Sequence, residues 1–179
     1  MNIKSIENPK TQLYTEFKSF VLSKSFSWYW YQESMPFDSP NDEYHNVPFL
    51  SHLFMERPES TESKFPKVNC DYVPTLSKLF LEILKHNNID VRCFLRMNAN
   101  CVLSSDRVLN TIPHVDHNYP HKNIVIYLTD SGGNIVVNNE IHDPKEDDVI
   151  VFDGQEHYVQ TPKPSKFSTR RIVLLATFI

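Results

Sequence analysis

The chain has 179 residues, of which 40% are hydrophobic and 22% charged, and its 22 acidic and 18 basic residues give a net charge of −4. This size and hydrophobicity are typical of one folded domain and exclude an intrinsically disordered protein. Proteins whose main task is to bind nucleic acid normally carry a basic surplus, so the charge disfavours that class. Three glycines are too few for a phosphate-binding loop, and nucleotide hydrolysis is close to excluded.

Three features of the sequence indicate the cellular compartment of the protein. No apolar run approaches the roughly 20 residues that cross a bilayer, and the polar start MNIKSIENPK lacks the pattern of a signal peptide. The three cysteines, Cys70, Cys93 and Cys101, form no CxxC pair, which disfavours a disulfide framework or a cysteine zinc site. We therefore expect a cytoplasmic protein without a membrane partner.

Helices and irregular segments are expected in the first half of the chain. Apolar residues at helical spacing predict one helix over residues 11–24 and a second that begins at Pro74 and ends at 86–88. The aromatic run 26–31 is rich in strand-forming residues. Five prolines between residues 33 and 69 predict a long covering loop.

From residue 90 onward the hydrophobic period changes from 3.6 to 2, which predicts strands. The expected strands are residues 91–101, 124–129, 135–137, 149–152, 158–160 and 172–178. Short strands at this spacing are typical of a β-sandwich or barrel. We therefore expect one domain over residues 1–179 that is mainly β with N-terminal helices. Residues 1–90 give helical and loop support, and residues 91–179 form a jelly-roll core with the helices packed on one face.

The sequence PHVD at residues 113–116 has the spacing of a metal site. Alternate side chains of a strand lie on one face, so His114 and Asp116 can bind the same ion. His157 follows the apolar strand 149–152 and a turn, and it is the best-placed third ligand. Two histidines and one carboxylate occupy one side of an octahedral metal, an arrangement diagnostic of mononuclear non-haem iron(II) oxygenases.

An arginine near the distal histidine is the second observation. If residues 157–161 and 169–178 form a hairpin about the proline-rich turn between them, Arg171 lies opposite His157, about one strand spacing away. A cation in an otherwise apolar strand needs an anion to justify its burial. A dicarboxylate that binds the metal at one end and the guanidinium at the other would supply it. The adjacent Arg170 faces the opposite way and is expected to be exposed.

The order of an HxD motif, a Gly-Gly pair, a distal histidine and an arginine before an apolar strand resembles that of the 2-oxoglutarate/Fe(II)-dependent oxygenases. The resemblance is greatest to small prolyl-4-hydroxylase-like members, particularly those encoded by bacteriophages, for which the compartment would be the host cytoplasm. The segments that carry it are Phe26 to Tyr31, Leu95 to Asn100, His114 to Asp116, Ile124 to Leu128, Val149 to Phe152 with His157, and Arg171 to Ile179.

The resemblance implies a double-stranded β-helix, a cupin-like jelly roll with the metal inside one end. It also implies an enzyme that uses Fe(II), O2 and the cosubstrate 2-oxoglutarate, releases succinate and CO2, and hydroxylates a C–H bond. His114, Asp116 and His157 would hold the iron, and Arg171 would bind the distal carboxylate of 2-oxoglutarate. By analogy, the substrate would be a peptide, prolyl in type, or a small molecule.

The chain departs from the family pattern after the arginine. Many relatives carry a hydroxyl residue two positions later, where this chain has Val173. In relatives, the strand before the triad often supplies a tyrosine or an asparagine to the cosubstrate. Here Asn98 and Asn100 are the candidates, both on one face with Arg96, and Asn100 is preferred.

The loop after the triad holds three residues that are candidates to face the substrate, His117, Tyr119 and His121. Loop histidines are more often only solvated, which is the competing interpretation. Tyr127 is expected in the core.

Two other functions stay open. The first is a zinc-dependent hydrolase, because HVDH contains residue types that zinc accepts, but a buried arginine would then be unexplained. The second is a non-catalytic jelly roll that keeps the pocket as a binding module. A nucleobase demethylase is disfavoured, because such a relative would usually present a second arginine in the last strand, and residues 173–179 contain none.

Overall fold

The computed structural model of the protein describes residues 3–36, 39–164 and 170–179. The first half contains β1 (Lys4–Ile6), α1 (Gln12–Val21), β2 (Tyr29–Tyr31), β3 (Tyr44–His45), β4 (Phe49–Glu56), a short 3₁₀ helix (Pro58–Ser60), β5 (Lys67–Val68) and α2 (Val73–His86). The second half contains β6 (Phe94–Leu103), β7 (Asn110–Thr111), β8 (Lys122–Tyr127), β9 (Ile135–Val137), β10 (Glu140–His142), β11 (Val149–Asp153), β12 (His157–Val159) and β13 (Arg170–Phe178). The prediction of a mainly β chain is confirmed.

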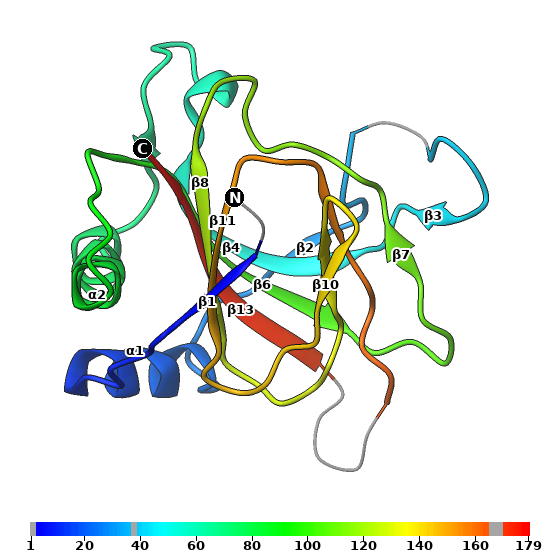
Figure 1. Ribbon diagram of the computed structural model, residues 1–179, viewed down its shortest axis with the longest axis horizontal. Helices are drawn as coiled ribbons and strands as arrows, with labels where there is room; N and C mark the ends of the chain where they lie inside the picture. Colours follow the sequence, from blue (N-terminus) through cyan, green and yellow to red (C-terminus); the bar gives the residue numbers. More distant parts are fainter. Residues whose placement is uncertain (1–2, 37–38, 165–169) are drawn as a thin grey trace.

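Most strands belong to one large sheet. Seven of its eight strands run in the order β1-β11-β8-β13-β6-β4-β2, and the eighth, β5, pairs with β4. A three-stranded sheet, β10-β9-β12, and a parallel pair, β3-β7, complete the strands of the described residues. In Figure 1 the two helices lie to one side of the large sheet and β10 lies to the other. The large sheet therefore has a helix-covered face and a face towards the small sheet.

Strand β13 shows how the two faces divide the core. Ile172, Leu174 and Ala176 belong to the apolar cluster that also contains the buried faces of α1 and α2. Val173 belongs to a second cluster, which includes residues of β8, β9 and β11. Arg171 is separated from Val173 by one residue and therefore lies on the same face, towards the small sheet.

The two predicted helices are present, close to their expected bounds. The Thr11 side chain accepts a hydrogen bond from the backbone N–H of Tyr14 (3.2 Å) and caps α1. Proline at the start of α2 leaves no hydrogen bond unmade, because the first turn of a helix has no intrahelical acceptor for its N–H groups. Both helices bury one apolar face in the same cluster.

The prediction of a covering loop over residues 33–69 is wrong, because β4 lies within it. This eight-residue strand pairs with β2 on one side and β6 on the other. Pro48 directly precedes the strand and Pro58 follows it, so the prolines bound it without interrupting its ladder. Four of its residues are buried in two adjacent pairs, which hides the period of 2 that would reveal a strand.

The predicted hairpin of residues 157–161 and 169–178 is also wrong. Strand β12 pairs with β9, and β13 lies between β6 and β8 in the large sheet. The two segments therefore belong to different sheets. Both partners of β13 are strands distant from it in sequence, which a hairpin between neighbouring segments does not anticipate. The expected turn at Ser165 lies outside the described residues.

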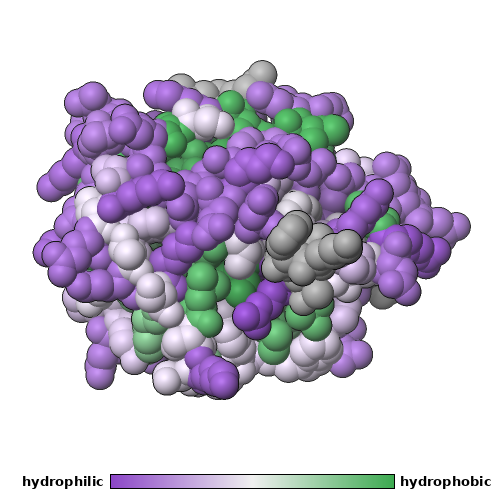
Figure 2. Space-filling model, turned by 90° about the horizontal axis from the view of Figure 1, so that it is seen from below, coloured by the Kyte–Doolittle hydropathy of each residue, from purple (hydrophilic) through white to green (hydrophobic). Residues whose placement is uncertain are grey.

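The surface and the helices agree with the composition. Figure 2 shows a face on which hydrophilic side chains predominate and hydrophobic ones form small separate patches. Neither helix of the described chain combines the length and the apolar character needed to span a membrane.

Asp147, in the turn before β11, ties α1 to the sheet. Its carboxylate accepts hydrogen bonds from the Tyr14 hydroxyl (2.5 Å) and Lys18 Nζ (2.5 Å), and Lys10 Nζ lies 2.8 Å away. Burial alone would raise the pKa of Asp147, but the hydrogen bonds from Lys10, Lys18 and Tyr14 outweigh it and lower the pKa to about 2. A carboxylate with a lowered pKa stabilises the fold above its ordinary pKa and ceases to do so as the pH falls through the folded value.

Asp147→Asn is therefore expected to lower the free energy of unfolding by about 1–2 kcal/mol at pH 7. The difference from wild type should shrink between about pH 4 and pH 2, where the wild-type carboxyl becomes protonated. Urea unfolding at pH 7 and at pH 3 measures it. Glu146→Gln, which removes only a more exposed partner of Lys18, should have a smaller effect. Equal stability of Asp147→Asn and wild type at pH 7 would contradict this account.

Candidate metal centre

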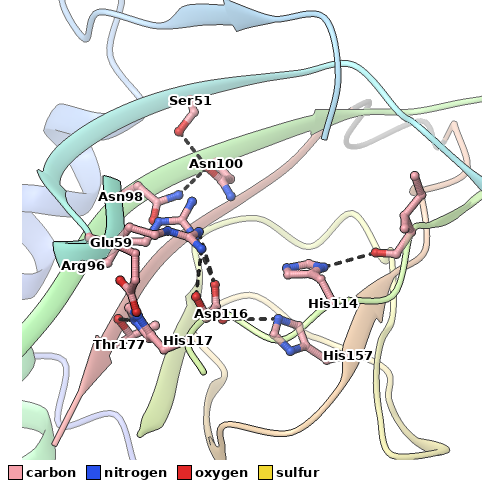
Figure 3. Close-up of polar contacts among 12 residues, drawn as sticks. Ser51, Glu59, Arg96, Asn98, Asn100, His114, Asp116, His117, His157 and Thr177 are labelled. Atoms are coloured by element: carbon pink, nitrogen blue, oxygen red, sulfur yellow. Dashed lines mark hydrogen bonds and ion pairs between the residues drawn. The ribbon is translucent and has the colours of Figure 1, made fainter. Parts of the chain in front are cut away.

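Three potential metal ligands come together where the loop between β7 and β8 meets β12. His114 and His157 form an antiparallel bridge, each donating its backbone N–H to the other's carbonyl (3.0 Å). Asp116 lies two residues further on, with its side chain towards both rings (Figure 3). The ligand atoms of the three residues lie within 4.8 Å of one another, and Asp116 Oδ2 is 3.5 Å from His157 Nε2. The backbone bridge thus positions the two histidines.

Both imidazole rings are held in the tautomer that binds metals. His114 Nδ1 is 3.1 Å from the Ile112 carbonyl, and His157 Nδ1 is 2.9 Å from the Gln155 carbonyl. A carbonyl can only accept, so the proton of each neutral ring is on Nδ1. Each Nε2 then keeps a lone pair for a cation, and the hydrogen bond fixes the direction of the ring.

The charge states of the ligands also suit a divalent cation. Burial lowers the pKa of His114 to about 4, and the neighbouring His157 adds to the shift, so the His114 ring is neutral at pH 7. Burial alone would raise the pKa of Asp116, but the electrostatic influence of the neighbouring His157 and Arg96 outweighs it and holds the pKa well below its usual range. A neutral imidazole and an ionised carboxylate are the forms that bind metals.

Two arginines hold the carboxylate and the backbone of Asp116. Arg96 Nη1 donates to Asp116 Oδ1 (3.0 Å), and Arg57 Nη2 lies 3.7 Å from the same oxygen. Arg57 Nη1 also donates to the Asp116 carbonyl (2.8 Å). Since Oδ1 is engaged, Oδ2 is the oxygen that faces the histidines. Sequence reasoning assigned no role to either arginine. The available signal was Arg96, which alternates with two asparagines on a buried strand.

The triad lies in a pocket of about 150 Å³ between the large and small sheets. Its lining includes Arg57, Arg96, Asn100, His114, Asp116, His157 and Arg171, with an apolar wall of Val125, Ile135, Phe152, Val173 and Leu175 among others. The Arg171 side chain enters this pocket and is only 3% exposed, whereas Arg170 is exposed. Strand alternation therefore separates the two arginines in the predicted sense, although the predicted hairpin is wrong.

Arg171 has a buried donor, Nε, that lacks a partner among the described residues. Its guanidinium is 5.0 Å from the ring centroid of Tyr127, and neither Arg171 Nε nor the buried Tyr127 hydroxyl has a hydrogen-bond partner among the described residues. A Cβ on Gly133 would lie 2.8 Å from Arg171 Cδ, so the glycine makes room for the arginine. Unpaired buried donors cost free energy unless an acceptor reaches them, and two donors side by side fit a carboxylate. Tyr127 was expected only in the core.

The two asparagines of β6 have different places. Asn98 is fully buried and donates through Nδ2 to Asn100 Oδ1 (2.6 Å), and the Ser51 hydroxyl donates to the same oxygen (2.8 Å). These two bonds fix the amide orientation of Asn100, whose Nδ2 is then the atom that remains for a ligand. Asn100 lines the pocket and Asn98 does not, so Asn98 supports Asn100 (Figure 3).

The three loop residues predicted to face the substrate do not line this pocket. His117 is buried beside it, with Nδ1 2.9 Å from Glu59 Oε1 and Nε2 2.8 Å from Thr177 Oγ1. Tyr119 packs against the His117 ring, and His121 Nδ1 is 2.8 Å from the Tyr119 carbonyl. Because both nitrogens of His117 are engaged, its side chain stays away from the pocket. His121 instead lines a separate surface pocket.

Comparison with known proteins gives matches among solved structures. No family model matches the sequence, and no curated protein matches it. An oxidoreductase of the 2OG-Fe(II) oxygenase family from Burkholderia pseudomallei superposes with a TM-score of 0.55 at 17% identity, covering 80% of this chain and 71% of that one. A prolyl hydroxylase from Trichoplax adhaerens, solved with a hypoxia inducible factor peptide, has a TM-score of 0.59 at 14% identity, covering 99% and 83%. The protein therefore shares its fold with these two solved structures, a 2OG-Fe(II) oxygenase family protein and a prolyl hydroxylase.

Proposed function

We propose that the protein is a 2-oxoglutarate- and Fe(II)-dependent oxygenase that hydroxylates a C–H bond of its substrate. The observation that supports this proposal most strongly is that His114, Asp116 and His157 lie in one pocket with the buried Arg171. Two Nε2 lone pairs and one carboxylate oxygen are the donor set of a facial triad. Bound Fe(II) would supply O2 activation, with 2-oxoglutarate converted to succinate and CO2.

The residues around the triad support binding of 2-oxoglutarate. Arg171 and the Tyr127 hydroxyl would donate to one carboxylate of the cosubstrate, which satisfies both buried groups. Asn100 would donate through Nδ2 and orient the end nearer the metal. The apolar wall, including Phe152 and Val173, would exclude water from the reacting groups.

The fold and the substrate complete the proposal. The large and small sheets would form a double-stranded β-helix around the pocket, as one domain over residues 1–179. The substrate would be a small molecule or a peptide. The structure of the Trichoplax prolyl hydroxylase contains a peptide fragment, which supports a prolyl-type peptide as one of these two substrate classes.

Thermal unfolding under anaerobic conditions tests the proposal. Fe(II) should raise the melting temperature. Addition of 2-oxoglutarate at about 100 times its dissociation constant should raise it by roughly a further 5–10 °C. Glutarate, which lacks the 2-oxo group, should give a smaller shift because it loses a metal contact. A zinc hydrolase would respond to Zn(II) but not to 2-oxoglutarate. Absence of any response to 2-oxoglutarate in the metal-loaded protein would contradict the proposal.

A further inference from the structure

The pocket carries more positive than negative charge. Among the described residues that line it, the arginines are Arg57, Arg96 and Arg171, and Asp116 is the only acid. Burial of charge is costly unless an opposite charge is near. One carboxylate cannot neutralise three guanidiniums, so the pocket favours anionic ligands.

The proposed function accounts for only part of this surplus. A divalent metal ion would add two positive charges, and the two carboxylates of 2-oxoglutarate would offset these at the triad and at Arg171. Arg57 and Arg96 then remain, and both approach the same Asp116 oxygen, at 3.7 and 3.0 Å. Two guanidiniums that share one oxygen lie side by side and repel each other, and a second anion would relieve that repulsion.

Arg57 and Arg96 lie in the more accessible part of the pocket. Their side chains are 29% and 19% exposed, whereas Arg171 is nearly inaccessible. In the described structure the two terminal nitrogens of Arg57 contact Asp116. A guanidinium has five N–H donors, so Arg57 keeps donors that a ligand can use. Substrate entering from solvent would meet these arginines before it reached the triad.

The apolar part of the lining lies at the other end of the pocket from Arg57 and Arg96. Met35, Val47 and Phe49 line the same pocket, and the Phe49 ring stacks on Tyr31 with centroids 5.2 Å apart and an interplanar angle of 21°. Strand β13 pairs Arg171 with Val102 and Thr177 with Arg96, and β4 pairs Leu50 with Cys101, so Phe49 lies at the Arg171 end of β6 and not beside Arg96. The arginine pair is therefore the part of the pocket that would recognise an acidic group on its own.

We propose that the substrate is an acid whose carboxylate or phosphoryl group binds Arg57 and Arg96. This inference rests on the proposed oxygenase function and names the class of substrate for the same pocket. The acid would bind in addition to 2-oxoglutarate, at a position nearer to solvent.

The test uses full-length protein loaded with Co(II), which replaces iron without turnover, and saturated with 2-oxoglutarate. Calorimetry compares phenylacetate with its neutral analogue phenylacetamide, and benzylphosphonate distinguishes a phosphoryl from a carboxylate preference. We expect at least one of the two acids to bind about 10- to 100-fold more tightly than phenylacetamide, the range of a charge-assisted hydrogen bond. Arg57→Gln should abolish this preference, and Arg107→Gln, at an exposed arginine outside the pocket, should keep it.

Co(II) stoichiometry and 2-oxoglutarate affinity are measured on the same samples. If Arg57→Gln loses Co(II), Arg57→Lys carries the test, and its preference should fall below that of wild type because an ammonium cannot replace the guanidinium fork. Equal binding of phenylacetamide, no binding of either acid, or an unchanged preference in the Arg57 variant that retains Co(II) overturns the inference. The oxygenase proposal then still stands, provided that 2-oxoglutarate binds. Wild-type protein that fails to bind 2-oxoglutarate contradicts the proposed function and this inference together.

Discussion

Arg171→Ala is expected to weaken 2-oxoglutarate binding by about 30- to 1000-fold while Fe(II) binding stays nearly unchanged. The variant removes a bidentate, charge-assisted contact to a carboxylate, which is worth roughly 2–4 kcal/mol. The effect is confined to the cosubstrate because Arg171 makes no hydrogen bond or ion pair with the triad in the described structure. Anaerobic calorimetry with metal-loaded protein measures both affinities.

Arg170→Ala is the matched control. The two arginines are adjacent on β13, but Arg170 is exposed and Arg171 is buried in the pocket. Arg170→Ala should therefore change neither affinity appreciably, and Tyr127→Phe should lower cosubstrate affinity less than Arg171→Ala because it removes one neutral donor. A large loss in Arg170→Ala, or none in Arg171→Ala, would be incompatible with the proposed carboxylate site.

His114→Ala is expected to lower Fe(II) affinity by more than about 100-fold and to abolish turnover. Changing a residue that only supports a metal ligand commonly costs 10- to 100-fold, so removal of a ligand should exceed that range. The fold should persist, because the backbone bridge between residues 114 and 157 does not involve the His114 side chain. Anaerobic metal titration measures the affinity, and circular dichroism checks the fold.

Asp116→Ala tests the same site, but it changes the stability of the fold together with metal binding. Its carboxylate is also the partner of Arg96 and Arg57, so its removal would leave two guanidiniums without their shared acceptor. Loss of one member of a buried ion pair is strongly destabilising. Asp116→Ala should thus lose both metal affinity and stability, whereas His114→Ala should lose mainly metal affinity. Unchanged metal affinity in either variant would remove the triad from consideration.

Local periodicity predicted the parts of the site that depend on local structure. The alternation of side chains along a strand placed His114 and Asp116 together, and the same rule separated Arg171 from Arg170. Both helices and most strands of the second half were predictable for the same reason, since their apolar spacing has a clear period of 3.6 or 2.

Long-range pairing decided what the sequence did not predict. Strand β4 hides its period because it is paired on both sides and buried on both faces. Arg57, which directly follows β4, therefore had no predicted place near Asp116. The contacts of His117 with Glu59 and Thr177 join residues about 60 positions apart in sequence, and no spacing rule reveals them. The same applies to β12 and β13, whose partners are not each other.

Oxygen-dependent succinate formation tests the central claim most directly. Protein loaded anaerobically with Fe(II) and 2-oxoglutarate and then exposed to O2 should form succinate slowly even without substrate, and His114→Ala should form none above the rate of free iron. The account predicts one succinate for each 2-oxoglutarate consumed in the wild-type protein. Wild-type protein with confirmed iron and 2-oxoglutarate binding that forms no succinate would contradict it and favour a non-catalytic binding module.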